Sequence, residues 1–202
     1  MGAVRTDREK KEASFYRLED KISQTLLDAR RVFLSGPIDD ELAEDVIKKL
    51  WYLDLSQKDK EIILIINSPG GSVDSGFAIW DQVKMLSSPI TTLVTGLAAS
   101  MGSVLSLCAP AKKRFVTPHA RIMLHQPLIS GTIHGQASDL EIHAKEILNT
   151  RRTLVELYAK ETGKDADLIE RIIERDTWMT AEEALEFGLV SAIISSSHFF
   201  HA

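Results

Sequence analysis

Short apolar runs alternate along the chain with stretches in which apolar residues recur every three or four positions. The apolar runs predict strands at residues 31–36, 62–66, 90–94, 115–116, 122–124 and 189–194. The helically spaced stretches predict helices that begin near residues 39, 72, 99, 136, 165 and 180. Strands that alternate with helices form βαβ units, so we predict an α/β fold with a largely parallel sheet. Its functional site is expected at the carboxyl ends of the strands.

A long segment without any charged residue runs from Met85 to Ala111. Its length alone is that of a membrane-spanning helix. It is interrupted, however, by Pro89, Gly96, Gly102 and several serines and threonines. We therefore predict a strand, a glycine turn and a small-residue helix, all buried in a protein core.

Composition and charge narrow the function classes. The chain has 202 residues, of which 44% are hydrophobic and 26% charged, which suits one globular domain and excludes disordered and fibrous proteins. Its 24 Lys and Arg against 29 Asp and Glu give a net charge of −5. An acidic chain of this size is a poor non-specific ligand for nucleic-acid phosphates, so we expect no nucleic-acid partner.

The single cysteine and the N-terminal segment bear on the cellular compartment in which the protein is expected. Cys108 lies in an apolar run and is expected to be a small buried hydrophobe, and one cysteine excludes an internal disulfide or a multi-cysteine zinc site. The segment from Met1 to Glu12 has mixed charge and no apolar signal core, which predicts a mobile arm. We expect a cytoplasmic protein with no membrane partner.

Ser100 is a candidate nucleophile. It lies at a predicted strand-to-helix turn, with Ala98 two positions before it and Gly102 two positions after it. This is the spacing of a nucleophile elbow, in which small flanking residues let a sharp turn expose the serine oxygen. The alternative is that these small residues only allow a helix to pack closely on a sheet.

A paired-glycine turn, 67–71, follows the strand predicted at 62–66. Its backbone N–H groups could form a phosphate cradle, an oxyanion hole or an ordinary turn. It is not a Walker A loop, because no Gly-Lys-Ser/Thr sequence follows.

A serine nucleophile needs a base, and His125 is the histidine that directly follows a predicted strand. Asp176 is a plausible carboxylate to orient the imidazole, although no spacing argument selects it among the acids. The histidines fit no common zinc-ligand spacing. The other histidines lie in loops, in the long predicted helix or in the C-terminal tail: His119, His134, His143, His198 and His201.

Four segments in this order resemble the ClpP family, the proteolytic subunits of the ATP-dependent Clp protease, over roughly residues 30–194. They are Ile66-Asn-Ser-Pro-Gly-Gly71, Gly96-Leu-Ala-Ala-Ser-Met-Gly102, His125-Gln-Pro127 and Gly135-Gln-Ala-Ser-Asp-Leu-Glu-Ile-His143. Glu174-Arg175-Asp176 adds a fifth. The resemblance implies a crotonase-type α/β fold of repeated ββα units with a protruding helical handle.

The resemblance also implies residue roles. It gives Ser100 as nucleophile, His125 as general base and Asp176 as orienting acid. Gly71 and Met101 would form the oxyanion hole. An extended peptide would bind along Gly70, Ser72, Val73, Gln126, Pro127 and Leu128, and Gln136, Glu174 and Arg175 would lie at contacts between rings.

The same resemblance divides the chain into an N-terminal arm or axial region (1–30), a peptidase domain (31–194) with its handle at about 128–162, and a tail (195–202). Two heptameric rings would form a barrel of fourteen subunits, made of this chain alone or mixed with a ClpP paralogue. An AAA+ unfoldase such as ClpX, ClpA or ClpC would feed it unfolded polypeptides. The partner would consume the ATP, so we expect no cofactor and no metal in this chain.

Two alternatives remain at this point. The segment Glu12–Ser23 departs from the family pattern before the first strand. This departure favours a weakly active or structural ring subunit that depends on an active paralogue. The second alternative is an acyl-CoA enzyme of the crotonase type, which shares the fold but leaves Ser100 and His125 without a role.

Overall fold

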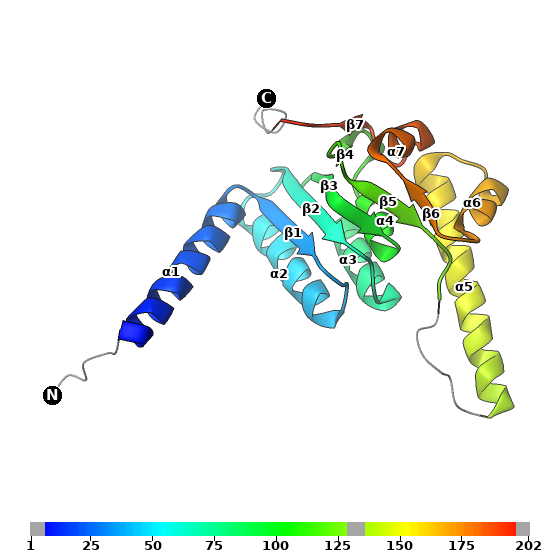
Figure 1. The fold of residues 1–202 in the computed structure, drawn as a ribbon, viewed down its shortest axis with the longest axis horizontal. Helices are drawn as coiled ribbons and strands as arrows, with labels where there is room; N and C mark the ends of the chain where they lie inside the picture. The colour runs from blue at the N-terminus through cyan, green and yellow to red at the C-terminus, as the bar shows by residue number, and fades with distance from the viewer. Residues whose placement is uncertain (1–6, 129–135, 197–202) are drawn as a thin grey trace.

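A seven-stranded sheet forms the centre of the molecule, with helices α2, α3 and α4 along one face (Figure 1). The computed structural model describes residues 7–128 and 136–196. The candidate histidines at 134, 198 and 201 lie outside these residues, as do part of the predicted handle and most of the predicted tail. The strands are β1 (Arg31–Ser35), β2 (Ile62–Ser68), β3 (Ile90–Ala99), β4 (Arg114–Val116), β5 (Arg121–Leu124), β6 (Thr177–Met179) and β7 (Ala192–Ile193).

The strand order is β1-β2-β3-β4-β7, and β5 pairs with both β3 and β6. All pairs are parallel except β5 with β6, so the predicted largely parallel α/β fold is confirmed. The helices are α1 (Asp7–Asp28), α2 (Asp40–Ser56), α3 (Val73–Met85), α4 (Met101–Ser106), α5 (Ala137–Thr162), α6 (Ala166–Ile173) and α7 (Ala181–Phe187), with a 3₁₀ turn at Ala111–Lys113.

The central strand β3 is longer than predicted. The sequence predicts an end at Val94 and a turn at Gly96, but the strand continues to Ala99. Its first half pairs with β4 and its second half with β5. Gly96 has a φ of +71°, and Leu97 N–H next to it donates to Asn67 Oδ1 at 3.2 Å. The glycine therefore bends the strand towards a second partner instead of ending it.

The two ends of the chain also differ from what the sequence predicts. The arm expected to be mobile up to Glu12 is helical from Asp7 onward, as part of α1, which projects from the body (Figure 1), and its mobility stays a prediction. Its Glu, Lys, Arg and Leu content favours a helix. The last strand is also shorter than predicted at 189–194, because only Ala192 and Ile193 pair with β4.

The predicted core is confirmed around α4. The uncharged segment 85–111 contains the end of α3, β3 and α4, and all six residues of α4 are buried. Cys108 is buried as predicted, and burial raises the pKa of its thiol to about 12, so the thiol stays protonated and unreactive at neutral pH. In the part of the chain that the structure describes, no helix combines the length and the apolar character that crossing a bilayer requires.

Helix α5 is fixed to the sheet at its C-terminal end and projects from the body at its N-terminal end (Figure 1). Arg114 of β4 is fully buried and donates to the backbone oxygens of Ala109 and Glu161 at 2.8 Å each. It also forms an ion pair with the Glu161 carboxylate. Gly163, in the left-handed conformation, ends the helix as predicted. The residues of α5 near Glu161 are therefore held at a defined position against the sheet.

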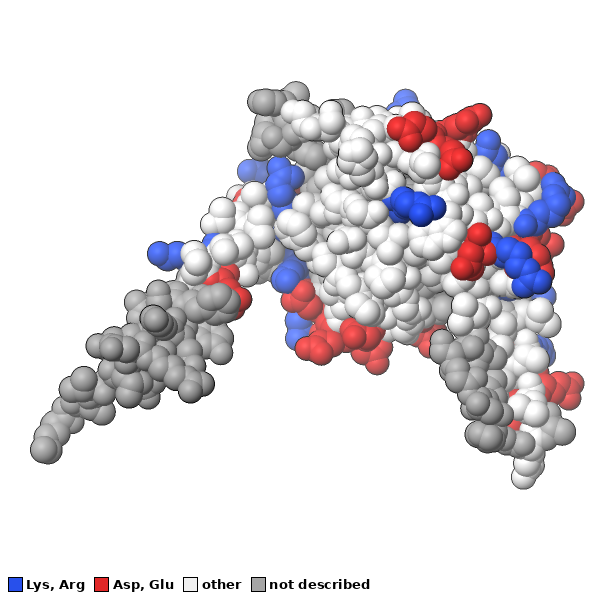
Figure 2. Space-filling view, viewed as in Figure 1, with Lys and Arg blue, Asp and Glu red and all other residues white. Residues whose placement is uncertain are grey.

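The surface carries charges of both signs. Figure 2 shows separate acidic and basic side chains around a largely uncharged central face. Acidic residues gather in the first turns of α2, at Asp40, Glu41, Glu44 and Asp45. This face has no continuous basic stripe of the kind that binds a nucleic-acid backbone.

Candidate active site

Strand β5 brings three of the predicted site residues together. Ala99 pairs with Met123 in the parallel ladder, so Ser100 emerges from β3 beside the end of β5. Leu124 pairs with Thr177 in the antiparallel ladder, so Asp176 lies next to His125. Backbone pairing thus sets the positions of all three side chains at one edge of the sheet.

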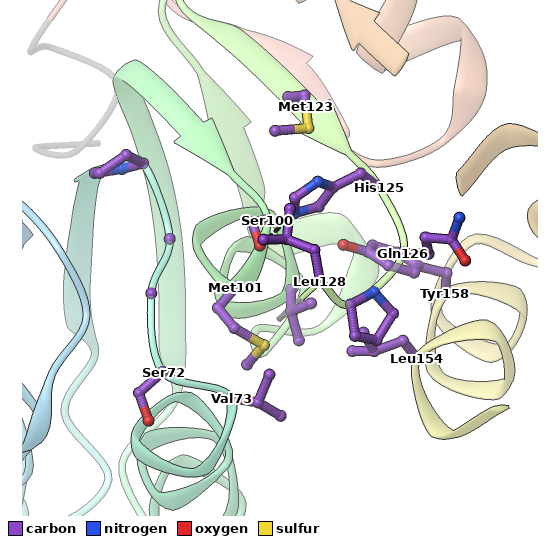
Figure 3. Close-up of a pocket in the computed structure, with 15 residues that line it drawn as sticks. Ser72, Val73, Ser100, Met101, Met123, His125, Gln126, Leu128, Leu154 and Tyr158 are labelled. Atoms are coloured by element: carbon purple, nitrogen blue, oxygen red, sulfur yellow. Dashed lines mark hydrogen bonds between the residues drawn. The ribbon is translucent and has the colours of Figure 1, made fainter. Parts of the chain in front are cut away.

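The three side chains form a continuous line of polar contacts. His125 Nε2 lies 2.8 Å from Ser100 Oγ, and Figure 3 shows the two side chains pointing towards one another. His125 Nδ1 lies 3.3 Å from Asp176 Oδ1. If Nδ1 carries the proton and faces Asp176, Nε2 has a lone pair for the serine proton. The imidazole is 14% exposed and the carboxylate 63%, so the line runs from the cavity to solvent.

Ser100 has a strained backbone. Its φ of 53° and ψ of −124° are unusual for a residue with a side chain, and such a conformation costs about 1–3 kcal/mol. Its N–H donates to the oxygen of Met123 at 2.9 Å. This geometry is typical of a nucleophile elbow, so it favours that interpretation over close helix packing alone.

Gly70 lies against the serine turn, and Gly71 beside it lies against the backbone of Ile38. Gly70 has a φ of +91°, and a Cβ there would lie 2.7 Å from the Ala99 oxygen and 2.7 Å from Ser100 Cβ. A Cβ at Gly71 would overlap the backbone of Ile38. The turn therefore approaches Ser100 more closely than any residue with a side chain could.

A cavity of about 620 Å³ opens beside Ser100 (Figure 3). All six residues predicted to bind substrate line it: Gly70, Ser72, Val73, Gln126, Pro127 and Leu128. The predicted oxyanion residues Gly71 and Met101 line it too. Met101 is the first residue of α4, so its N–H has no acceptor within the helix.

The sequence does not predict all of the residues that line the cavity. Val104, Leu154 and Tyr158 line the cavity together with Val73 and Leu128, and they make this wall largely apolar. Such a wall suits an apolar side chain of an extended peptide. Leu154 and Tyr158 are four residues apart, so helical spacing predicts a shared face of α5 but not what that face contacts.

A comparison with models of known protein families shows to which family this chain belongs. A family model described as Clp protease matches residues 14–197. The chain belongs to the Clp protease family. It is therefore a peptidase subunit. This membership favours the peptidase interpretation of the sequence over the interpretation as an acyl-CoA enzyme.

Individual members of the Clp protease family agree with this assignment. Three similar relatives are each named ATP-dependent Clp protease proteolytic subunit 1. The relative from Protochlamydia amoebophila is 61% identical over 180 residues, which cover 89% of this chain and 87% of the relative. The relative from Chlamydia abortus is 60% identical (89% and 94%), and that from Chlamydia trachomatis serovar D is 59% identical (90% and 94%).

The residues that the Clp protease resemblance gives as ring contacts have contacts within this chain. Gln136 caps α5 in a capping box with Asp139. The Glu174 carboxylate lies 3.8 Å from an Arg151 nitrogen. The backbone oxygen of Glu174 accepts a hydrogen bond from Gln126 Nε2 at 3.1 Å. Arg175 lines a second cavity, of about 480 Å³, together with His125 and Asp176. A role for Gln136, Glu174 and Arg175 between rings stays a prediction.

The other candidate histidines in the described part of this Clp protease chain, His119 and His143, are exposed and do not line the cavity beside Ser100. Among the described residues, no group of three or more His, Cys, Asp or Glu could hold a metal ion.

Proposed function

We propose that this chain is a serine endopeptidase in which Ser100, His125 and Asp176 act as the catalytic triad. The observation that carries the proposal is the continuous line of contacts from Ser100 Oγ through both imidazole nitrogens to the Asp176 carboxylate. The strained backbone of Ser100 supports the same role, because strain persists at sites where function requires an exposed side chain.

The first half of the reaction forms an acyl-enzyme. His125 Nε2 accepts the Ser100 proton while Oγ attacks the carbonyl carbon of a peptide bond. Asp176 holds the imidazole in the required tautomer and stabilises the imidazolium that forms. The tetrahedral intermediate collapses when the imidazolium donates its proton to the leaving nitrogen, which breaks the C–N bond.

The second half releases the acyl group. A water molecule gives a proton to His125 and attacks the acyl carbon, and the proton then returns to Ser100 Oγ as the ester bond breaks. In both halves the N–H groups of Gly71 and Met101 stabilise the oxyanion. This role is supported by their place in the cavity beside Ser100.

The proposed substrate is an unfolded polypeptide in an extended conformation. It would lie between the Gly70–Val73 turn and the Gln126–Leu128 segment, pair with their backbone groups and place an apolar side chain against Val104 and Leu154. Backbone pairing recognises any extended chain, so this mode suits a peptidase that acts on many sequences.

We also propose that the chain assembles with other Clp components. Two seven-membered rings of this chain, alone or with a paralogue, would enclose the sites, and an AAA+ unfoldase would deliver the substrate. Native mass spectrometry of the purified chain is expected to give a complex with fourteen subunits. A monomer that remains monomeric after a paralogue is added would contradict the proposed barrel.

The proposed activity is tested by labelling the purified protein with a fluorophosphonate, which reacts with activated serines. Intact mass spectrometry should detect a single adduct, and Ser100→Ala should abolish it. No adduct on the chain alone, followed by an adduct once a paralogue is present, would favour the partner-dependent subunit. An adduct that persists in Ser100→Ala would contradict the assignment of the nucleophile.

A further inference from the structure

Buried hydroxyl groups connect α5 to the backbone of the candidate nucleophile. Ser103 Oγ donates to the backbone oxygen of Ser100 at 2.7 Å, and Tyr158 Oη lies 2.7 Å from Ser103 Oγ. A serine hydroxyl has one proton, and Ser103 gives it to the Ser100 oxygen. The Tyr158 hydroxyl must therefore be the donor to Ser103.

This chain of hydrogen bonds is shielded from water. Ser103 is 0% exposed and Tyr158 is 1% exposed. Burial raises the pKa of the Tyr158 hydroxyl far above its ordinary value. Tyr158 is thus a neutral donor at any physiological pH. Removal of the Tyr158 hydroxyl leaves Ser103 Oγ with one interaction fewer.

The backbone oxygen of Ser100 is the point on which these contacts converge. It accepts the N–H of Ser103 at 2.9 Å and the N–H of Val104 at 3.2 Å, in addition to the Ser103 hydroxyl. A strained residue keeps its conformation only when its surroundings over-determine it. On the other side of the residue, the Ser100 N–H is held by Met123.

We propose that Tyr158 is a positioning residue for Ser100, acting through the hydroxyl of Ser103. The inference rests on the proposed role of Ser100 as the nucleophile. Tyr158 fixes the Ser103 rotamer, and Ser103 in turn fixes the Ser100 peptide, so the direction of Ser100 Oγ towards His125 depends on a donor from α5. Figure 3 shows the Tyr158 side chain extending from α5 towards the side of the cavity where Ser100 lies.

A competing explanation is that Tyr158 only lines the cavity and contacts substrate. Tyr158→Phe separates the two roles, because it keeps the ring and removes the donor. A lining residue would leave kcat unchanged in this variant. A positioning residue would lower kcat by about three- to tenfold, the equivalent of one hydrogen bond, and leave KM within about twofold.

Ser103→Ala should lower kcat by a similar factor, and the double variant Ser103→Ala with Tyr158→Phe should be no slower than Ser103→Ala alone.

Ser106→Ala is the matched control. Ser106 is as buried as Ser103, lies on the same helix and also donates at 2.7 Å to a backbone oxygen, but that oxygen belongs to Ser103. Its loss should lower stability without lowering kcat.

Hydrogen exchange tests the same inference without enzymatic activity. In Tyr158→Phe, the amides of Ser103 and Val104 should exchange faster than in the wild type, whereas Ser106→Ala should leave their exchange closer to that of the wild type. Unchanged kcat together with unchanged exchange in Tyr158→Phe would overturn the positioning role. An equal loss of kcat in Ser106→Ala would also overturn it. A wild-type protein that no fluorophosphonate labels, with or without a paralogue, would instead count against the proposed function.

Discussion

Ser100→Ala is expected to lower kcat for peptide hydrolysis by about a millionfold, as removal of the nucleophile does in other serine triads. The variant keeps the cavity and the two proposed oxyanion N–H groups but has no oxygen 2.8 Å from His125 Nε2 to attack the substrate. Only the weak acceleration from binding and oxyanion stabilisation would remain. The measurement is steady-state hydrolysis of a fluorogenic peptide.

The controls for this prediction are measurements of thermal stability and of KM. Removal of one oxygen from a strained residue should leave the thermal unfolding temperature and KM close to those of the wild type. Peptide hydrolysis at the wild-type rate in Ser100→Ala would sink the triad assignment, whereas a parallel loss of folded protein would make the kinetic result a stability effect.

Gly70→Ala is expected to lower kcat by about a hundredfold, because its new Cβ would meet the Ala99 oxygen and Ser100 Cβ, each at 2.7 Å. Gly70 cannot move away easily. Its N–H donates to Ser68 Oγ at 3.0 Å, and its oxygen accepts the Ile38 N–H at 2.8 Å. The serine turn must shift instead, and the alignment of Ser100 Oγ with His125 would be lost. The measurement is kcat beside the rate of fluorophosphonate labelling.

Gly36→Ala is the matched control for Gly70→Ala. Gly36 has a φ of +90°, nearly that of Gly70, but a Cβ there would meet no atom within 4 Å. Both variants therefore pay a similar cost for a left-handed alanine, of about 1–2 kcal/mol, and only one disturbs the site. Equal kcat values in the two variants would contradict the claim that Gly70 controls the geometry of Ser100.

Local sequence singles out two of the three residues in the candidate triad. His125 follows a predicted strand, and small residues flank Ser100 at a strand-to-helix turn. Both choices rest on rules that act over a few residues. Asp176 could not be found this way, because it meets His125 through the antiparallel pairing of β6 with β5, about fifty residues away in sequence. The sequence makes Asp176 plausible, but only the family resemblance selects it among the acidic residues.

Two strand segments that the sequence does not predict, β6 and the second half of β3, also depend on distant partners. Strand β6 has three residues, too few for a periodic pattern, and is defined by its pairing with β5. The second half of β3 continues past Gly96 because β5 supplies a new partner there. Likewise, nothing in the spacing of Leu154 and Tyr158 reveals that their face of α5 meets the cavity.

The late position of β6 has a consequence for biosynthesis. A ribosome delivers β3 first, then β5, and β6 only after the whole of α5 and α6 has emerged. Until β6 docks, the Asp176 carboxylate is not beside His125 Nδ1, and a nascent chain therefore carries the serine and the histidine without the third member of the proposed triad. The order of synthesis itself would keep an incomplete protease from cutting its neighbours on the polysome.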